Sequence, residues 1–289
     1  MIIDRLYQSV KEKGSVCVGL DTAVEYIPEE FLKKYNSLED GIVSFNQRII
    51  DATIENAACF KVQIAYYEAL GLLGLRAYKR TLKYIKENKA ISISDIKRGD
   101  IAKTAQMYAK AHFEGDFESD FITLSPYMGM DSVEPYLEYV DKKEKGLFLL
   151  LRTSNEGAKD IQYITTKNDK RVYNVVGEKI QHIGEKYLGN CQYSSIGAVV
   201  GCTHGEEAEK IRKDLNKTFF LIPGYGAQGG GAKDVALYMN KGNGGIVNSS
   251  RGILLAYKKR ENGEKEFDRW AGEEALNMRK ALEEACKNI

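Results

Sequence analysis

The chain has 289 residues, 43% hydrophobic and 29% charged, a composition typical of a soluble globular protein that can bury a sizeable core. Its 42 basic and 41 acidic residues leave almost no net charge, which argues against nucleic acid or an anionic membrane as the main partner. The five cysteines are odd in number without a Cys-x-x-Cys pair, and no apolar run approaches the roughly 18 residues of a membrane span, so we expect a cytoplasmic protein with reduced thiols.

Short apolar segments that favour β-strands alternate with segments of helical periodicity. The predicted strands cover residues 15–20, 58–63, 90–94, 121–125, 146–151, 196–201, 218–223 and 244–249. The predicted helices cover residues 40–56, 66–87, 101–113, 133–142, 172–187, 206–215, 232–240 and 273–287. This alternation predicts an α/β fold, a (β/α)8 TIM barrel that forms a single domain over residues 1–289, with an excursion over 156–195 after the fifth strand. A doubly wound open sheet is the alternative, but no Gly-x-Gly-x-x-Gly follows the first strand.

Polar side chains follow or end most of the predicted strands, at the carboxyl ends where a barrel carries its chemistry. They are Asp21, Lys61, Gln63, Asp95, Lys97, Thr153, Ser154, Gln228 and Arg251. The alternation of side chains along a strand supports a shared rim, because Cys59, Lys61 and Gln63 lie on one face of the second strand. Each such face runs from apolar or small residues at one end to charged residues at the other.

Residues 94–104 read SDIKRGDIAKT and hold one lysine among carboxylates. Asp95 and Lys97 can project to the same face of the third strand, while Asp100 lies past the strand end, where the chain turns. Opposite charges within about 4 to 6 Å favour the ionised form, so Lys97 should remain an ammonium and act as an acid rather than a nucleophile. The alternative is an ordinary solvated loop with exposed ion pairs.

Two further segments are typical of phosphate binding. Residues 223–231 read PGYGAQGGG, and the next strand is followed by NSSRG at 248–252, which contains Arg251. Glycines let backbone N–H groups approach an anion, arginine adds a fork of donors, and barrels often bind phosphate in the loops after strands seven and eight. A flexible surface loop is the alternative for the glycine run.

Taken together, six segments resemble the orotidine 5'-monophosphate decarboxylase family, in particular its longer bacterial-type (type 2) branch. They are VGLD with Asp21, FKVQ with Lys61, DIKRGDIAKT, RTSN at 152–155, PGYGAQGGG and NSSRG, and the resemblance extends from about Gly14 to Arg251. It implies a lyase that converts orotidine 5'-monophosphate to uridine 5'-monophosphate and carbon dioxide, in pyrimidine biosynthesis, without metal or organic cofactor.

The resemblance also implies the role of each residue. Lys97 would protonate C6 of the pyrimidine, Asp95 would lie beside the departing carboxylate, and Lys61 would join Asp95 to Asp100. The expected substrate-binding residues are Asp21 for a ribose hydroxyl, Thr153 and Ser154 for the pyrimidine amide edge, Gly226, Gln228, Gly229 and Arg251 for the phosphate, and Gln63. In this family Asp100 and Thr104 come from the neighbouring subunit, so we expect a homodimer.

Three other functions stay open at this point. A sugar-phosphate enzyme on the same barrel would use an Asp-x-Lys-x-x-Asp segment with magnesium. A Schiff-base aldolase would use Lys97 or Lys61 as its nucleophile, although neighbouring aspartates raise the pKa of an amine and oppose that role. An inactive barrel could bind nucleotides without turning them over. The histidines at 112, 182 and 204 have no metal-ligand spacing and are expected to be packing or surface residues.

Overall fold

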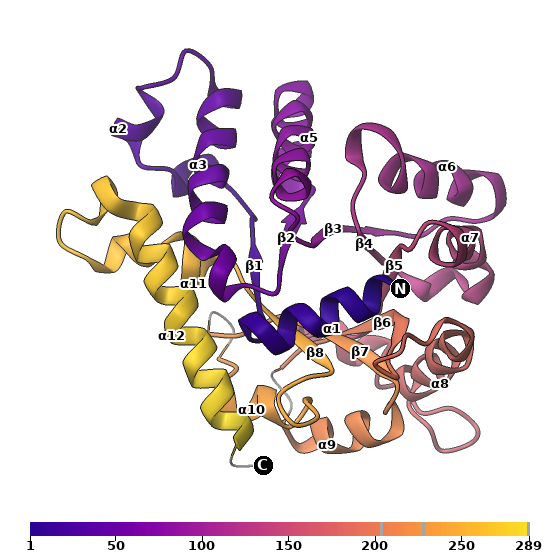
Figure 1. The fold of residues 1–289 in the computed structure, drawn as a ribbon. Coiled ribbons are helices and arrows are strands. Elements are labelled where there is room, and N and C mark those ends of the chain that lie inside the picture. Colours follow the sequence, from indigo (N-terminus) through magenta and orange to yellow (C-terminus); the bar gives the residue numbers. More distant parts are fainter. Residues whose placement is uncertain (203–204, 227–228, 288–289) are drawn as a thin grey trace.

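The computed structural model describes residues 1–202, 205–226 and 229–287. Within these residues, parallel strands close into an eight-stranded barrel in chain order (Figure 1). The strands are β1 Val16–Gly19, β2 Cys59–Gln63, β3 Ser92–Arg98, β4 Phe121–Leu124, β5 Gly146–Arg152, β6 Ser194–Val200, β7 Thr218–Ile222 and β8 Gly245–Ser249. The predicted (β/α)8 barrel is confirmed.

Helices precede, connect and follow the strands, and most of them cover the outside of the barrel. They are α1 Ile2–Lys13, α2 Glu29–Leu32, α3 Leu38–Thr53, α4 Ala65–Glu68, α5 Gly71–Glu87, α6 Ala102–Phe113, α7 Glu134–Lys142, α8 Val172–Gly184, α9 Gly205–Asp214, α10 Ala232–Ala236, α11 Arg251–Leu254 and α12 Phe267–Lys287. Short 3-10 turns are η1 Val24–Tyr26, η2 Ile54–Asn56, η3 Gly115–Phe117, η4 Pro126–Met128, η5 Met130–Ser132, η6 Glu156–Asp160, η7 Glu185–Tyr187, η8 Ala256–Lys259 and η9 Gly263–Glu266.

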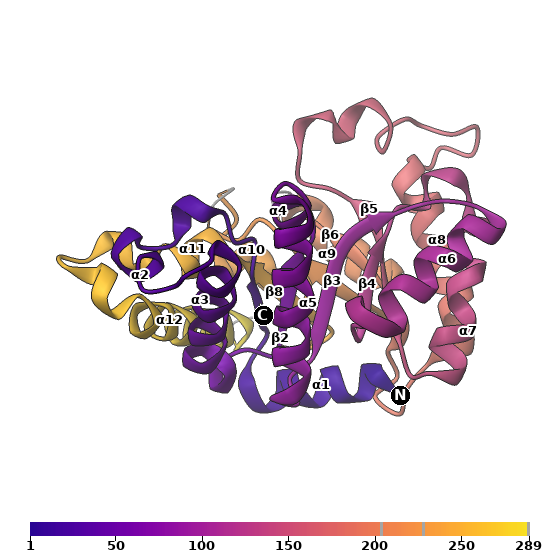
Figure 2. The same ribbon diagram turned by 90° about the horizontal axis from the view of Figure 1, so that it is seen from above.

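The inside of the barrel is closed at its amino-terminal end by α1, for which the sequence analysis predicted no helix. Ile2, Ile3, Leu6 and Val10 share one buried face of α1 and belong to the same cluster as interior side chains such as Cys17, Cys59, Ile93, Phe148 and Phe219. Because these interior residues alternate with outward ones along each strand, the predicted parity of the strands is confirmed. Figure 2 shows α1 at one end of the barrel and the excursion after β5 at the other.

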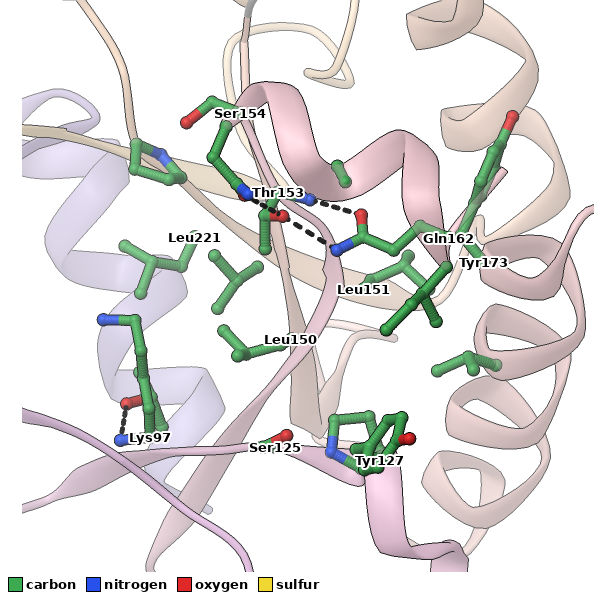
Figure 3. A pocket seen from close by; sticks show the side chains of 18 of the residues that line it. Lys97, Ser125, Tyr127, Leu150, Leu151, Thr153, Ser154, Gln162, Tyr173 and Leu221 are labelled. Atoms are coloured by element: carbon green, nitrogen blue, oxygen red, sulfur yellow. Dashed lines mark hydrogen bonds between the residues drawn. The ribbon is translucent and has the colours of Figure 1, made fainter. Parts of the chain in front are cut away.

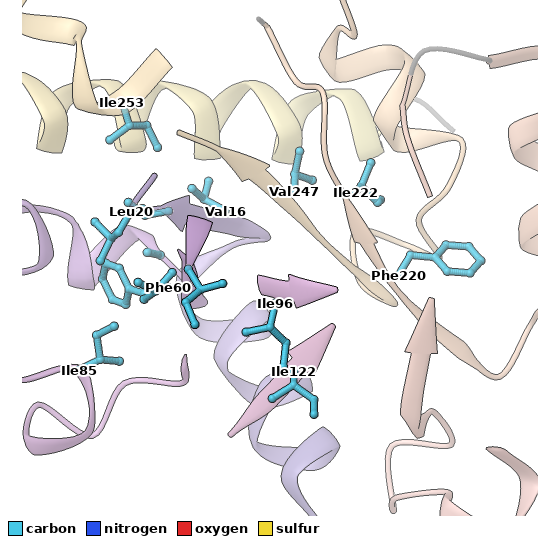
Figure 4. Packing of buried hydrophobic residues seen from close by; sticks show 14 of the residues in the cluster. Val16, Leu20, Phe60, Ile85, Ile96, Ile122, Phe220, Ile222, Val247 and Ile253 are labelled. Atoms are coloured by element: carbon cyan, nitrogen blue, oxygen red, sulfur yellow. The ribbon is translucent and has the colours of Figure 1, made fainter. Parts of the chain in front are cut away.

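A second, larger core lies between the strands and the surrounding helices. Outward side chains of the strands, such as Val16, Phe60, Ile122 and Val247, pack there with residues of the helices and loops, such as Ile85 and Ile253 (Figure 4). Each buried side chain of this size contributes roughly 1.5 to 3 kcal/mol of transfer free energy. This layer fixes the strands, and therefore the positions of the side chains that end them.

The main departure from the predicted elements is the third strand, which continues through Arg98 instead of ending at residue 94. Its register with β4 shifts between Ser94 and Arg98, because a bulge interrupts the ladder there. The excursion is also shorter than predicted: α8 is a regular barrel helix, and residues 153–171 alone leave the barrel, with an isolated bridge between Thr165 and Arg171.

Candidate active site

The charged side chains of the first three strands converge at the carboxyl end of the barrel. Asp21 follows β1, Lys61 and Gln63 end β2, and Asp95 and Lys97 lie on β3. Neighbouring parallel strands bring Lys61 level with Ile93 and Gln63 level with Asp95. For these three strands the predicted rim is present, and hydrogen bonds join its side chains to one another.

Asp95 is the centre of this array. Its Oδ1 accepts hydrogen bonds from Lys97 Nζ at 2.6 Å and from Thr123 Oγ1 at 2.8 Å, and its Oδ2 accepts them from Lys61 Nζ at 3.1 Å and Gln63 Nε2 at 2.9 Å. Burial alone would raise the pKa of Asp95, but the charges of Lys61 and Lys97 outweigh it and hold the pKa well below its usual range. The carboxylate is thus ionised and fixed from both sides.

Lys61 joins Asp95 to Asp21, whose Oδ1 lies 3.0 Å from Lys61 Nζ. The Lys61 side chain is only 5% exposed. Burial by itself would lower the pKa of Lys61, but the charges of Asp21 and Asp95 raise it above its usual range. Within one chain, therefore, the aspartates that Lys61 connects are Asp21 and Asp95, and a contact between Lys61 and Asp100 stays a prediction for the dimer.

A hydroxyl just after β8 completes this side of the array. Ser250 Oγ donates a hydrogen bond of 2.8 Å to Asp21 Oδ2, and Asn248 Nδ2 lies 3.3 Å from Ser250 Oγ. The approach depends on Gly19, because a Cβ atom there would lie 1.9 Å from Ser250 Oγ. Ser250 was not predicted from the sequence, where its only signal is its place beside Arg251 at the end of a strand.

Lys97 differs from Lys61 in its surroundings. Its backbone has a φ of 45°, an uncommon left-handed conformation for a residue with a side chain. The side chain is 45% exposed and reaches back to Asp95. The prediction that Asp95 and Lys97 project together is confirmed, although a bulge rather than a regular pleat brings them together.

A cavity of about 780 Å³ opens beside this array. Its lining includes Lys61, Asp95, Lys97 and Thr123, apolar side chains from Leu150, Val199 and Leu221, and the start of the excursion at Thr153, Ser154 and Asn155. Tyr127, which is 78% exposed, lines its outer edge. A cavity of this size, with apolar side chains in its lining and a few polar groups gathered on one side, is typical of a small-molecule site.

Thr153 and Ser154 line the cavity, and Thr153 is already engaged in hydrogen bonds. Its N–H donates to Gln162 Oε1 at 2.9 Å, and Gln162 Nε2 donates to its hydroxyl at 2.8 Å (Figure 3). Thr153 Oγ1 also lies 2.6 Å from Asn155 Oδ1. Gln162 therefore ties the excursion to the end of β5, a role that the sequence analysis missed because Gln162 lies far from any strand end.

The predicted phosphate end is only partly described. Gly226 and Gly229 have positive φ values of 70° and 87°, which favour glycine, whereas Gln228 lies outside the described residues. Arg251 is exposed at the start of α11. Burial raises the pKa of Tyr66, and the charge of Asp21 raises it further. The charge of Arg251 lowers this pKa, so Asp21 and Arg251 both act on the Tyr66 side chain.

Asp100 and Thr104 do not join the site of their own chain. Asp100 Oδ1 accepts a hydrogen bond from the N–H of Ile101 at 2.8 Å, and Thr104 is exposed on α6. The segment at residues 94–104 is therefore divided: Asp95 and Lys97 line the cavity, and Asp100 does not.

The remaining expectations concern histidines, metals and membranes. His112 is buried and stacks on Phe117, His182 is exposed, and His204 lies outside the described residues. Among the described residues, His, Cys, Asp and Glu side chains do not gather in threes that could hold a metal ion. In the same part of the chain, every helix is too short or too polar to cross a membrane.

Comparison with known proteins gives consistent results. The sequence model of the "Orotidine 5'-phosphate decarboxylase / HUMPS family" matches residues 14–265. Proteins named orotidine 5'-phosphate decarboxylase from Clostridium acetobutylicum and Clostridium kluyveri are 68% and 62% identical over 279 and 288 residues, which cover 96% and 100% of this chain and 98% and 99% of those proteins.

Solved structures are similar over nearly the whole length. Leishmania donovani OMP decarboxylase has 29% identity and a TM-score of 0.72, with 95% of this chain and 99% of that chain covered. Plasmodium berghei orotidine 5'-monophosphate decarboxylase has 24% identity and a TM-score of 0.76, with 98% and 100% covered, and supports the barrel fold.

Proposed function

The chain belongs to the orotidine 5'-phosphate decarboxylase / HUMPS family, and on this premise we infer that it converts orotidine 5'-monophosphate to uridine 5'-monophosphate and carbon dioxide. The observation that carries the inference is the array of Asp21, Lys61, Asp95 and Lys97 beside a cavity of nucleotide size. The reaction is the carboxy-lyase step that produces uridine 5'-monophosphate in pyrimidine biosynthesis.

Lys97 acts as the general acid. When the bond between C6 and the carboxylate breaks, its electron pair remains on C6, and the Lys97 ammonium both stabilises this charge and supplies the proton. Lys97 is then neutral and must regain a proton from solvent, which its 45% exposure supports. The product carries hydrogen at C6, and carbon dioxide leaves without taking a proton.

Asp95 holds Lys97 in place and faces the departing carboxylate. Because four donors fix it and its pKa is held low, it can neither turn away nor accept a proton when a second carboxylate approaches. Two neighbouring carboxylates repel each other, and the repulsion ends when carbon dioxide forms. Stabilisation of the charge at C6 by Lys97 remains the main contribution to the rate.

The other predicted residues bind the rest of the nucleotide. Asp21 and Lys61 bind ribose hydroxyls, Ser154 with Thr153 reads the pyrimidine amide edge, and Gly226, Gln228, Gly229 and Arg251 bind the phosphate. The cavity lining supports the assignments of Lys61, Thr153 and Ser154. Gln63 donates to Asp95, which supports a role in holding that carboxylate, and its contact with substrate stays a prediction.

We also propose that the chain is one domain and works as a cytoplasmic homodimer in which Asp100 and Thr104 complete the neighbouring site. Two apolar side chains near these residues in the sequence, Ile101 and Met107, are 49% and 48% exposed in the single chain. Their exposure supports a surface that a partner subunit covers. Exposed apolar side chains are often covered where they belong to a protein interface. Asp100 would then add its carboxylate to the partner's Lys61 and Lys97.

The test is direct. Mixing the protein with orotidine 5'-monophosphate should cause loss of the orotate absorbance, at the same rate in excess chelator. Dependence on magnesium would instead favour a sugar-phosphate enzyme of the same barrel type, and a borohydride-trapped adduct would favour an aldolase. Unchanged absorbance with folded, dimeric protein would contradict the decarboxylase assignment and leave a barrel that only binds nucleotides.

A further inference from the structure

We propose that Thr123 on β4 is a positioning residue that holds Asp95 and Lys97 in their reacting arrangement. The inference rests on the proposed decarboxylase function for its kinetic consequence, but its geometry stands on the contacts of one hydroxyl group. Thr123 was not among the candidate residues of the sequence analysis, because a single threonine inside the apolar segment FITLS has no distinguishing signal.

The bulge between β3 and β4 explains why this hydroxyl is needed. Ser94 pairs with Ile122, and Arg98 pairs with Leu124, so Thr123 alone faces the stretch that contains Asp95, Ile96 and Lys97. In a regular ladder the N–H groups of a strand point alternately to its two neighbours, and those that point to β4 would bond its carbonyl groups; a bulge removes such partners. Buried N–H groups without a partner are costly.

Thr123 supplies the missing partners through its side chain. Its Oγ1 accepts hydrogen bonds from the N–H of Ile96 at 3.0 Å and from the N–H of Lys97 at 2.9 Å, and it donates to Asp95 Oδ1 at 2.8 Å. A hydroxyl has one donor and two acceptor positions, so all three are used. Thr123 is 1% exposed, so water does not compete for them.

The consequence falls on Lys97. Its left-handed backbone, with a φ of 45°, persists only where surrounding contacts hold it, and the hydrogen bond to Thr123 acts at the amide of that same residue. The backbone at Lys97 and the carboxylate of Asp95 are thus fixed by one atom, and Lys97 Nζ meets the oxygen that Thr123 also binds. Displacement by about 1 Å of a catalytic group can cost a hundredfold in rate.

Two substitutions separate the hydroxyl from the shape of the side chain. Thr123→Val keeps the branched volume but loses all three hydrogen bonds, whereas Thr123→Ser keeps the hydroxyl and loses a methyl group. We expect Thr123→Val to lower kcat about ten- to a hundredfold, with KM and the Kd of uridine 5'-monophosphate within about threefold of the unchanged protein. Thr123→Ser should retain kcat within about threefold. Thr218→Val, at the start of β7, is the matched control for loss of a buried threonine.

Hydrogen–deuterium exchange supplies a readout that does not require activity. In Thr123→Val, the peptide that contains Ile96 and Lys97 should exchange at least about tenfold faster, and in Thr123→Ser it should not. If the unchanged protein does not consume orotidine 5'-monophosphate, the proposed function fails, and exchange alone decides the role of Thr123. The inference would be overturned if the Val and Ser variants had the same kcat, whether unchanged or reduced. Unchanged exchange in Thr123→Val would overturn it as well.

Discussion

Lys97 and Asp95 form an asymmetric ion pair at the mouth of the barrel. Lys97 Nζ lies 2.6 Å from Asp95 Oδ1, yet the lysine side chain is 45% exposed and the aspartate side chain is 8% exposed. The carboxylate is held by hydrogen bonds on both oxygens, while the ammonium pairs with this carboxylate alone among the described residues. This asymmetry suits a fixed anion beside a proton donor that is reloaded from solvent.

Replacing the donor should remove the reaction without unfolding the protein. Lys97→Ala should lower kcat by roughly 10³-fold or more, since proton transfer and charge stabilisation at C6 are lost together. Product binding and Tm should change little, because Lys97 is half exposed. Lys142→Ala removes an exposed lysine on α7 and is the control. Retention of more than a tenth of the wild-type kcat in Lys97→Ala would contradict the assignment of the proton donor.

Arg251 should act through the phosphate although it does not touch the reacting carbon. We expect Arg251→Ala to lower kcat/KM about a hundredfold, because binding energy from the phosphate helps to hold the base over Lys97. Calorimetry should show weaker binding of uridine 5'-monophosphate and unchanged binding of uridine. Arg260→Ala, which removes another exposed arginine from the same end of the chain, is the control. Equal losses for the nucleotide and the nucleoside would place Arg251 away from the phosphate.

Shared sites across a dimer should allow complementation between inactive subunits. Lys97→Ala and Asp100→Asn should each have little activity alone. In a heterodimer of the two, one site has both defects and the other has none, so co-expressed subunits should recover about a quarter of the wild-type activity. Each site would lack one residue if Asp100 served its own chain, and activity would then stay at the level of the parent variants. Sedimentation should show dimers throughout.

The excursion is tied to the barrel by Glu207 on α9. Tyr163 Oη donates to its Oε2 at 2.8 Å, the Arg171 guanidinium pairs with its Oε1, and the fully buried Arg152 lies 3.9 Å from its Oε2. Glu207→Gln should lower the free energy of unfolding by roughly 3 kcal/mol, because Arg152 loses its carboxylate. Chemical denaturation measures the change, and Glu178→Gln, from the exposed pair with Lys170, should be nearly neutral.

His112 should make stability depend on pH. Burial, and then the charge of Arg98, lower the pKa of His112 from 6.5 to about 4. Between these values the unfolded chain binds a proton that the folded chain does not, so this contribution is complete above pH 6.5 and is lost as pH falls to about 4. At about 1.4 kcal/mol per pH unit the loss reaches about 3 kcal/mol.

Denaturation at a fixed protein concentration measures the free energy of unfolding. Between these pH values it should decline less steeply in His112→Leu than in the wild-type protein. His182→Leu, which removes a histidine side chain that is 84% exposed, should follow the unchanged protein. Parallel pH curves for His112→Leu and the unchanged protein would show that His112 does not titrate differently in the two states.

Much of the fold and part of the site could be predicted from residue order alone. Periodicity and spacing predicted the barrel, and the alternation along β2 and β3 put Lys61, Gln63, Asp95 and Lys97 at one rim. These features depend on the geometry of a single strand, where successive side chains point to opposite faces. The N-terminal helix α1 was not predicted, although Ile2, Ile3, Leu6 and Val10 have the spacing of one helical face; only the closed barrel shows that this face packs against the interior side chains.

The contacts that complete the array could not be predicted in this way. Thr123 meets Asp95 across 28 residues of sequence, and Ser250 meets Asp21 across 229. The link from Lys61 to Asp21, the bulge that turns Lys97 onto Asp95 and the anchoring of Thr153 by Gln162 are of the same kind. Residue order determines which face of a strand a side chain occupies, whereas the partner it meets depends on the register between strands and on the closure of the barrel, which arise only when the whole sheet packs.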